Sequence, residues 1–333
     1  MTPSATVFVT GGSGFVGRNI VQLLKKRGFE ICLLSRQAPE GEAEAGVKVV
    51  VGDLTRPETY AAALRQASAV VHAALTGTFT EDVAATLMLQ KLSAESGVQK
   101  FIHLSSIVVT GTRMEGTITE ETPLLPVYDD YSRAKLAIEQ GLQTNSGPPE
   151  LLILRLGCVY GPGGGWWSNS LLKMMERGKL ILVNGGTGTA NLIHVSDVAA
   201  IVAALLERDN SQVDIFHVTD GMPVPWSLYF SELEGILGRA ATVSMTVEEA
   251  RAHGRKWLRP SLARRAVRKL MRGEIIYPME DHAINGFASR AIYSNSKASA
   301  MLGFRPMYDL RSGMETVRLD RSSSRGDREN STV

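Results

Sequence analysis

The chain has 333 residues, of which 44% are hydrophobic and 21% are charged, and its formal net charge is +2. A chain of this length can bury a large core and is long enough for about two domains. The balanced charge gives no indication of a nucleic-acid partner, and no apolar run approaches the ~20 residues that a membrane-spanning helix needs.

The cysteines and the N-terminus favour an intracellular setting. Cys32 and Cys158 lie in apolar runs without the spacing of a metal site, so we interpret them as core residues and predict no bound metal. Nothing in their placement indicates an oxidising compartment. The first predicted strand follows residues 1–4 directly, which leaves no room for a signal peptide. We therefore predict a cytoplasmic protein without a transmembrane segment.

A glycine cluster at residues 10–17 lies between a predicted strand and a predicted helix. The β-branched run 5–9 is typical of a buried strand, and the apolar spacing over residues 15–24 predicts a helix that closes at Gly28. In this context a glycine turn binds a dinucleotide, because it tolerates positive φ and lets the backbone approach a pyrophosphate at the helix N-terminus. The predicted cradle comprises Gly11, Gly14, Phe15, Val16 and Gly17.

The second predicted strand, residues 30–34, ends at Ser35 and Arg36. NAD enzymes place an acid about 20 residues beyond the glycines, where it binds the ribose 2′-hydroxyl. Here a hydroxyl and a fixed cation stand instead, and these suit a 2′-phosphate. We therefore predict NADP as the preferred cofactor, with NAD as the alternative. An ordinary solvated arginine after a strand is the competing interpretation.

The third predicted strand, residues 47–51, is followed by Asp53 and Leu54. An aspartate at the carboxyl end of such a strand points into the cofactor crevice, where it can accept a bond from the adenine amino group. It can equally cap the helix predicted over residues 55–64, and the two roles are compatible. We assign both Asp53 and Leu54 to the cofactor site.

The fourth predicted strand, residues 69–74, ends in two small residues, Ala73 and Ala74, that let the backbone pack close to the cofactor. We assign both to the cofactor site. His72 lies within this apolar strand, so we interpret it as a structural histidine.

The next segments carry side chains suited to catalysis. A helix is predicted over residues 81–96, and the fifth strand, residues 99–104, ends in Ser105 and Ser106. Tyr131 and Lys135 follow, four residues apart at the start of a helix predicted over 132–142, and therefore on one face.

Tyr131 and Lys135 become reactive only as a pair. The pKa of tyrosine is about 10, so a tyrosine acts as a base near neutral pH only where cations favour its phenolate. Lys135 and an oxidised nicotinamide would supply that field, while a serine hydroxyl holds the substrate oxygen. The same spacing is common on helix surfaces, but its place after a serine-terminated strand in a dinucleotide domain favours catalysis.

At these motifs the chain resembles the extended short-chain dehydrogenase/reductase family, which includes NAD(P)-dependent epimerases and dehydratases and 3β-hydroxysteroid dehydrogenase-like enzymes. The resemblance extends from residue 5 to about residue 315. It rests on motifs in the family's order at residues 10–17, 52–54, 103–106, 131–135, 155–162, 191–198 and 297–306.

The resemblance implies a doubly wound parallel α/β (Rossmann) fold with a smaller C-terminal substrate domain, and a catalytic set of Ser106, Tyr131 and Lys135. Ser106 is preferred to Ser105 because it lies five residues before Gly111, where the family places its Ser or Thr. The resemblance also implies a homodimer formed through the helices of residues 81–96 and 131–144.

Two positions differ from the sugar-nucleotide enzymes of the family, and these differences narrow the range of expected substrates. Ile107 and Val108 stand where sugar-nucleotide dehydratases carry acids, so the chain lacks an agent for water elimination. Cys158 replaces an Asn that holds the diphosphate in many sugar-nucleotide enzymes, and a thiol is a poor hydrogen-bonding group. The Ser-Ser-Ile stretch is similar to that of 3β-hydroxysteroid dehydrogenases and dihydroflavonol reductases.

We therefore predict an oxidoreductase that transfers hydride between NADP(H) and a carbonyl or carbinol of a small molecule, with Tyr131 as acid/base. One alternative is a nucleotide-sugar 4-epimerase that keeps its cofactor tightly bound. A second alternative is a non-catalytic NADP-binding regulator, which the intact catalytic set argues against.

We assign residues 1–160 to the dinucleotide-binding domain, with 191–219 returning to it, and 161–190 and 220–319 to the substrate part. In the loop around Trp166 and Trp167, four glycines and two indoles predict either a mobile aromatic surface for a ligand or two packed side chains.

Two C-terminal segments stand apart from these motifs. Residues 251–272 hold nine Lys or Arg and no acid; this segment predicts a solvated helix face, or contact with an anionic membrane or substrate. The polar tail 320–333 is predicted to be disordered.

Overall fold

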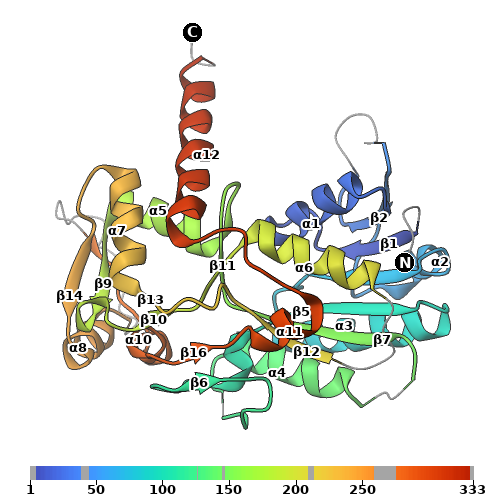
Figure 1. The fold of residues 1–333 in the computed structure, drawn as a ribbon, viewed down its shortest axis with the longest axis horizontal. Coiled ribbons are helices and arrows are strands. Elements are labelled where there is room, and N and C mark those ends of the chain that lie inside the picture. The colour runs from blue at the N-terminus through green and yellow to red at the C-terminus, as the bar shows by residue number, and fades with distance from the viewer. Residues whose placement is uncertain are drawn as a thin grey trace.

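The computed structural model describes residues 5–38, 45–125, 127–144, 147–208, 214–258 and 275–330. Within these residues the main sheet has seven strands in the order β12-β7-β5-β4-β1-β2-β3, all parallel (Figure 1). Its strands are β1 (Thr6–Thr10), β2 (Glu30–Ser35), β3 (Val47–Val51), β4 (Ala69–His72), β5 (Lys100–Ser106), β7 (Glu150–Leu156) and β12 (Asp214–Val218).

The strand order reverses between β1 and β4. From β1 the chain moves outward to β2 and β3, and it then returns to place β4 on the other side of β1. At such a reversal the loops beyond the carboxyl ends of the strands separate and leave a crevice, which is where ligands bind in open parallel sheets. The doubly wound α/β fold predicted from the sequence is confirmed.

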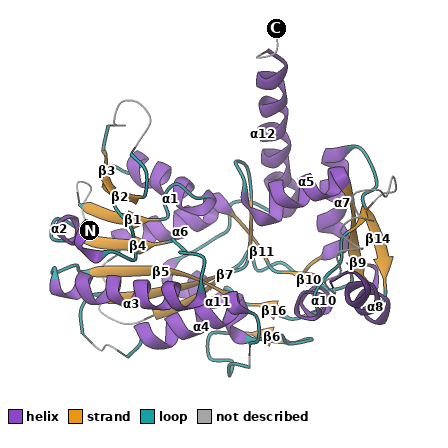
Figure 2. Ribbon diagram, turned by 180° about the vertical axis from the view of Figure 1, so that it is seen from behind, coloured by secondary structure: helices purple, strands orange, loops and turns teal. Residues whose placement is uncertain are grey.

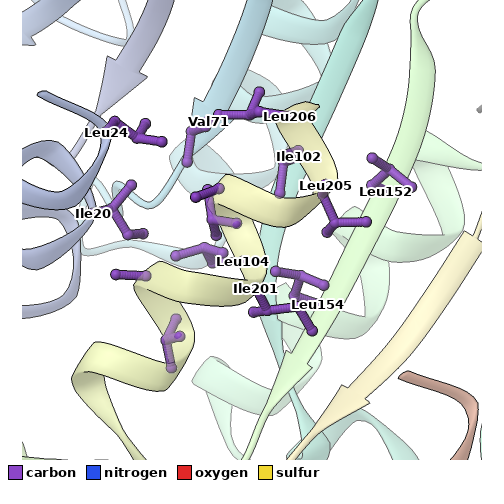
Figure 3. Packing of buried hydrophobic residues seen from close by; sticks show 14 of the residues in the cluster. Ile20, Leu24, Val71, Ile102, Leu104, Leu152, Leu154, Ile201, Leu205 and Leu206 are labelled. Carbon is purple, nitrogen blue, oxygen red and sulfur yellow. The ribbon is translucent and has the colours of Figure 1, made fainter. Parts of the chain in front are cut away.

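Two apolar layers cover the sheet because its strand residues alternate between faces. On one face, α1 (Phe15–Lys26) and α6 (Val195–Glu207) bury side chains against the strands; Figure 3 shows Ile20 and Ile201 beside Leu104 and Leu154. The other face is covered by α3 (Phe79–Glu95) and α4 (Asp130–Leu142), which lie side by side in Figure 2.

The predicted elements of this sheet agree closely with the observed ones. β3 has the predicted bounds, and the helix predicted over residues 81–96 corresponds to α3. The helix predicted over 55–64 is replaced by a 3-10 turn, η1 (Pro57–Thr59), and a short helix, α2 (Ala61–Leu64). Strand β5 runs two residues beyond its predicted end, so that Ser105 and Ser106 belong to the strand.

The C-terminal part gathers to one side of the main sheet (Figure 1). Its small parallel sheet has the order β14-β9-β15 and packs against helices over an aromatic core that includes Trp226, Tyr229 and Phe230. These elements are α5 (Leu171–Arg177), β9 (Gly178–Val183), α7 (Trp226–Leu237), β14 (Thr242–Met245), α8 (Val247–Leu258), β15 (Ile275–Ile276) and α10 (Asp281–Ala288).

Short strand pairs and turns join the two parts. The strand pairs are β8 with β11, β10 with β13, and β16 with β6. These and the remaining elements are β6 (Thr117–Ile118), β8 (Cys158–Tyr160), β10 (Thr189–Ala190), β11 (Leu192–His194), β13 (Val224–Pro225), β16 (Ile292–Tyr293), η2 (Ile107–Thr110), η3 (Gly165–Ser170), η4 (Asn184–Gly186), α11 (Ser296–Leu302) and α12 (Leu310–Asn330).

Residues 320–330, where the sequence predicts a disordered tail, are helical in the structure. These residues continue α12, which extends away from the rest of the molecule (Figure 1). Contacts with the body hold the helix at the point where disorder was predicted: Asp320 Oδ2 accepts a hydrogen bond from the Gly163 N–H, and Arg321 forms an ion pair with Glu176. Residues 331–333 lie outside the described residues.

The basic segment 251–272 is described only in its first part, since residues 259–272 lie outside the described residues. Residues 251–258 form the end of α8. The Nη2 atom of Arg251 donates to Asn285 Oδ1 at 2.8 Å, and its Nε lies 3.7 Å from Asp281 Oδ1. Arg251 therefore joins α8 to α10. Among the helices of the described ranges, none combines the length and apolar character needed to span a membrane.

Candidate active site

The glycine turn brings three backbone segments together where only glycine fits. Gly11 has a φ of +71°, and a Cβ added to it would lie 2.6 Å from the Ala73 carbonyl carbon and the Ala74 nitrogen. A Cβ on Gly17 would lie 2.2 Å from the Gly11 carbonyl oxygen. Any side chain at either position would push α1 away from the carboxyl ends of β1 and β4.

The start of α1 is suited to an anion. The helix begins at Phe15, its N-cap Gly14 supplies no side-chain hydrogen bond, and its first turn holds no acid. The N–H groups of the first turn therefore remain available to an anionic ligand at the positive end of the helix dipole. The cradle formed by Gly11, Gly14, Phe15, Val16 and Gly17 fits the diphosphate of a dinucleotide.

The end of β2 offers a hydroxyl and a guanidinium, as predicted. Ser35 Oγ donates to the Gln37 carbonyl at 2.8 Å and accepts from its N–H at 3.2 Å, which shapes the turn after the strand. Arg36 is exposed beside it.

Asp53 caps the turn after β3. Its Oδ1 accepts from the N–H and the hydroxyl of Thr55 at 2.9 and 2.7 Å. These bonds are the main reason that its pKa is lowered, with smaller contributions from the positive charges of Arg56 and Arg36. Asp53 therefore closes a tight turn with Thr55 and does not cap a helix, because η1 begins after Arg56 and neither η1 nor α2 has a side-chain cap. Leu54 beside it is buried, and the contact of Asp53 with adenine stays a prediction.

The structure brings Ser106, Tyr131 and Lys135 together. Ser106 ends β5, where its Oγ accepts from the Val108 N–H at 3.4 Å, and its hydroxyl is close enough to Tyr131 to act on the pKa of the phenol. Tyr131 and Lys135 lie one turn apart on α4. The Lys135 ammonium donates to the Leu104 carbonyl of β5 at 2.7 Å. The catalytic roles of these three residues stay a prediction.

Burial changes the acidity of both titratable groups. Although 47% of Tyr131 is exposed, burial around its phenol raises its pKa, and the Ser106 hydroxyl acts in the opposite direction. Burial lowers the pKa of Lys135 to about 8, while the carboxylates of Asp82 and Glu139 act to raise it. Near neutral pH the pair therefore combines a protonated phenol with an ammonium that is easily deprotonated.

His72 has a structural place beneath this site. Its Nδ1 lies 2.6 Å from Thr10 Oγ1, its Nε2 lies 2.9 Å from Thr86 Oγ1, and its ring stacks on that of His103 at 5.3 Å. Burial, followed by the charge of Lys135, lowers the pKa of His72 to about 3. The imidazole is therefore neutral in the folded protein across the physiological range.

The glycine-rich loop of residues 161–165 lies against the start of α1, a contact that the sequence did not predict. Arg18 Nη2 donates to the Gly163 carbonyl at 2.6 Å, and a Cβ on Gly165 would lie 2.6 Å from the Phe15 ring. The two neighbouring indoles behave differently. Trp166 is 59% exposed, whereas Trp167 stacks on Trp226 with ring centroids 5.1 Å apart.

A second feature missed from the sequence is a buried ion pair behind Ser106. Glu139 of α4 accepts hydrogen bonds from both Arg155 of β7 and the Ser105 hydroxyl. An arginine at the end of the apolar run 151–154 was a signal for such a pair, because a buried charge needs a partner. Its partner depends on how β7 packs against α4, which spacing along the chain does not specify.

The model of the NAD dependent epimerase/dehydratase family matches residues 7–218, more than half of the chain. The chain belongs to this family. The 2'-dehydrokanamycin reductase of Streptomyces kanamyceticus is 29% identical over 246 residues, 70% of this chain and 67% of that protein. The decarboxylating sterol-4-alpha-carboxylate 3-dehydrogenase of Dictyostelium discoideum is 25% identical over 247 residues, 68% of this chain and 74% of that protein.

A solved structure of MoeE5 in complex with UDP-glucose and NAD shares the epimerase/dehydratase fold. It has a TM-score of 0.72 and 22% identity, and the match covers 96% of this chain and 99% of that chain. Reductases, dehydrogenases and epimerases are all found among the relatives of this family member. The predictions of the family and of an NAD(P)-dependent enzyme of oxidoreductase type are confirmed.

The neutral state of His72 predicts a pH dependence of stability. Its pKa is about 3 in the folded protein and ordinarily 6.5, so the unfolded chain binds more protons between these values. The free energy of unfolding therefore falls as pH drops below about 6.5. In His72→Gln this fall should be shallower by up to about 1.4 kcal/mol per pH unit.

Urea unfolding at a series of pH values measures this slope. Parallel curves for wild type and His72→Gln would show that the imidazole is not held neutral by the fold.

Proposed function

We propose that this enzyme transfers hydride between a nicotinamide cofactor, with NADP preferred, and the carbonyl or carbinol of a small molecule, with Tyr131 as acid/base. The observation that carries the proposal is the meeting of Ser106, Tyr131 and Lys135 at the edge of the sheet that also holds the glycine turn. A protein that only bound the cofactor would not need these three groups together.

The proposed mechanism divides the work among the three side chains. A bound nicotinamide supplies or accepts the hydride. Ser106 holds the substrate oxygen by a hydrogen bond, and Tyr131 gives its phenolic proton to that oxygen as the carbonyl is reduced. The Lys135 ammonium stabilises the phenolate that remains. In the reverse direction the phenolate takes the proton back from the carbinol.

The acidity of the resting site supports reduction as the direction for which it is prepared. Because burial raises the pKa of Tyr131, the phenol carries its proton near neutral pH, which is the form that a carbonyl substrate requires. Oxidation of a carbinol would first require the loss of that proton.

The preference for NADP rests on Ser35 and Arg36. Ser35 is the last residue of β2 and Arg36 follows it, at the position where an acid would bind the ribose 2′-hydroxyl of NAD. An acid at this position would repel the 2′-phosphate of NADP, whereas a guanidinium attracts it and can bind its oxygens through paired N–H groups. The hydroxyl of Ser35 is held at the same turn by its bonds with Gln37.

We further propose how the chain is divided and assembled. Residues 1–160 with 191–219 bind the dinucleotide, and 161–190 with 220–319 bind the substrate, with the exposed Trp166 offering apolar surface. The chain forms a homodimer through α3 and α4, where Met88 is 40% exposed on the outer layer. It acts in the cytoplasm, consistent with the free thiols of Cys32 and Cys158.

Epimerisation of a nucleotide sugar is the alternative within the same family. It is less well supported because Cys158, where many sugar-nucleotide enzymes carry an amide, binds a diphosphate poorly. Burial also raises the pKa of this thiol, so it stays neutral and protonated.

Tyr131→Phe tests the proposed acid/base. Loss of the phenol oxygen should lower turnover by about 10²–10⁴-fold, the usual contribution of general acid–base catalysis, while leaving cofactor affinity nearly intact. Tyr128→Phe is the matched control, because Tyr128 is 81% exposed and lies before α4. Steady-state kinetics and fluorescence titration with NADPH measure both quantities. Substantial turnover in Tyr131→Phe would remove the assigned role.

Arg36→Ala tests the cofactor preference. A hydrogen bond to a charged group contributes about 1.5–3 kcal/mol, so the loss of Arg36 should weaken NADPH about tenfold or more. NADH, which lacks the 2′-phosphate, should bind nearly as before. Arg65→Ala, which removes an exposed guanidinium after α2, should affect neither cofactor. Equal weakening of NADPH and NADH by Arg36→Ala would exclude a 2′-phosphate role.

A further inference from the structure

A buried carboxylate connects the strand that carries Ser106 with the helix that carries Tyr131 and Lys135. Glu139 is 1% exposed and lies on α4, one turn after Lys135. Its Oε1 and Oε2 accept from Arg155 Nε at 3.2 and 3.1 Å, and Oε2 also accepts from Arg155 Nη2 at 2.8 Å. Its Oε1 accepts a further hydrogen bond from the Ser105 hydroxyl.

The strand register places both partners of Glu139 at the active edge of the sheet. Ser105 and Arg155 stand directly opposite each other on β5 and β7. Ser105 is also the neighbour of Ser106 in the strand. One carboxylate of α4 therefore binds two adjacent strands at their carboxyl ends, beside the residues that the proposed chemistry uses.

An ion pair at this place needs an explanation other than stability. Removing two charges from water offsets most of the attraction between them, and apolar side chains of similar volume often stabilise a core as well. A forked contact between Arg155 and Glu139 provides a fixed distance and direction, which apolar packing does not.

The same two strands carry a second buried ion pair at their opposite ends. Lys100 of β5 and Glu150 of β7 also stand opposite each other, with 3.6 Å between Nζ and Oε2 and side chains 6% and 5% exposed. This pair lies at the amino ends of the strands, far along β5 from Ser106. It is therefore a natural control for the general effect of removing a buried carboxylate between β5 and β7.

We propose that Glu139 is a positioning residue that sets the spacing between Ser106 and the face of α4 that carries Tyr131 and Lys135. It acts through Ser105 on the strand and through its own helix on the Tyr–Lys pair. The inference rests on the proposed function, because it assigns Glu139 a role in placing the groups of that site. A displacement of ~1 Å in such a site can cost about 100-fold in rate.

Glu139 also contributes to the charge around Lys135. The groups that face this ammonium are Asp82 from α3, Glu139 from α4, and the neutral imidazoles of His72 and His103 from β4 and β5. Asp82 is the larger of the two negative contributions, so the loss of Glu139 leaves the ammonium partly compensated. Position, rather than charge alone, should therefore dominate the effect on catalysis.

Glu139→Gln and Glu150→Gln form the decisive pair of variants. Each exchanges a buried carboxylate that is paired with a cation of β5 or β7 for an amide of similar shape. We expect Glu139→Gln to lower kcat about 100-fold with little change in the KM for NADPH, and Glu150→Gln to keep kcat near that of wild type. Thermal unfolding measures how far each variant is destabilised. If the two variants lost the same stability and the same fraction of kcat, Glu139 would have only a structural role, and the proposal would be overturned.

A titration that needs no turnover separates this proposal from the proposed function. Carbon-13 labelling of tyrosine Cζ reports phenol ionisation by NMR, and the Tyr131 resonance is identified by its loss in Tyr131→Phe. Because the Ser106 hydroxyl acts to lower the pKa of Tyr131, a movement of Ser106 away from the phenol in Glu139→Gln should raise that pKa. Glu150→Gln should leave it unchanged.

Each outcome of the titration decides one of the two proposals. An unchanged Tyr131 pKa in Glu139→Gln would overturn the positioning role even if kcat fell. A shifted pKa in an enzyme without oxidoreductase turnover would support positioning and contradict the proposed function. If Glu139→Gln does not fold, Ser105→Ala removes only one bond to the carboxylate and should shift the Tyr131 pKa in the same direction by less. No shift in that variant would also overturn the proposal.

Discussion

The close approach of two backbone segments at Gly11 and Gly17 is the constraint on which the rest of the structure depends. A Cβ on Gly17 would lie 2.2 Å from the Gly11 carbonyl oxygen, so α1 reaches its position only because both residues lack side chains. With α1 in place, α6 packs against it, and their apolar side chains cover one face of the sheet. The same contact places the N-terminus of α1 at the carboxyl ends of the strands, beside the end of β4.

Much of the fold could be predicted because its strands are short apolar runs bounded by glycines and charges. β3 is predicted from a run of valines, and the bounds match. The substrate side was harder, because β14 and β15 are short and pair with β9 through contacts distant in sequence. The helical course of residues 320–330 was missed because composition favours disorder there, whereas Asp320 and Arg321 bind Gly163 and Glu176.

The candidate site also has a part that the sequence predicts and a part that it does not. The spacing of Tyr131 and Lys135 predicts one helix face, and Ser106 was identified from the family resemblance, which implies a Ser or Thr five residues before Gly111. The support behind them could not be read from spacing, because Glu139 meets Arg155 only through the register of β5 and β7. Local periodicity thus predicts which side chains share an element, while tertiary packing decides how firmly they are held and how burial changes their pKa.

Consumption of free NADPH by the full chain tests the central claim most directly. The assay offers exchangeable NADPH, with NADH alongside, to a panel of ketones, aldehydes, sterol ketones and nucleotide sugars. We predict that a ketone or aldehyde is reduced with one NADPH oxidised for each carbinol formed. A cofactor that co-purifies, resists dialysis and supports interconversion of nucleotide-sugar epimers without net oxidation of NADPH would contradict it.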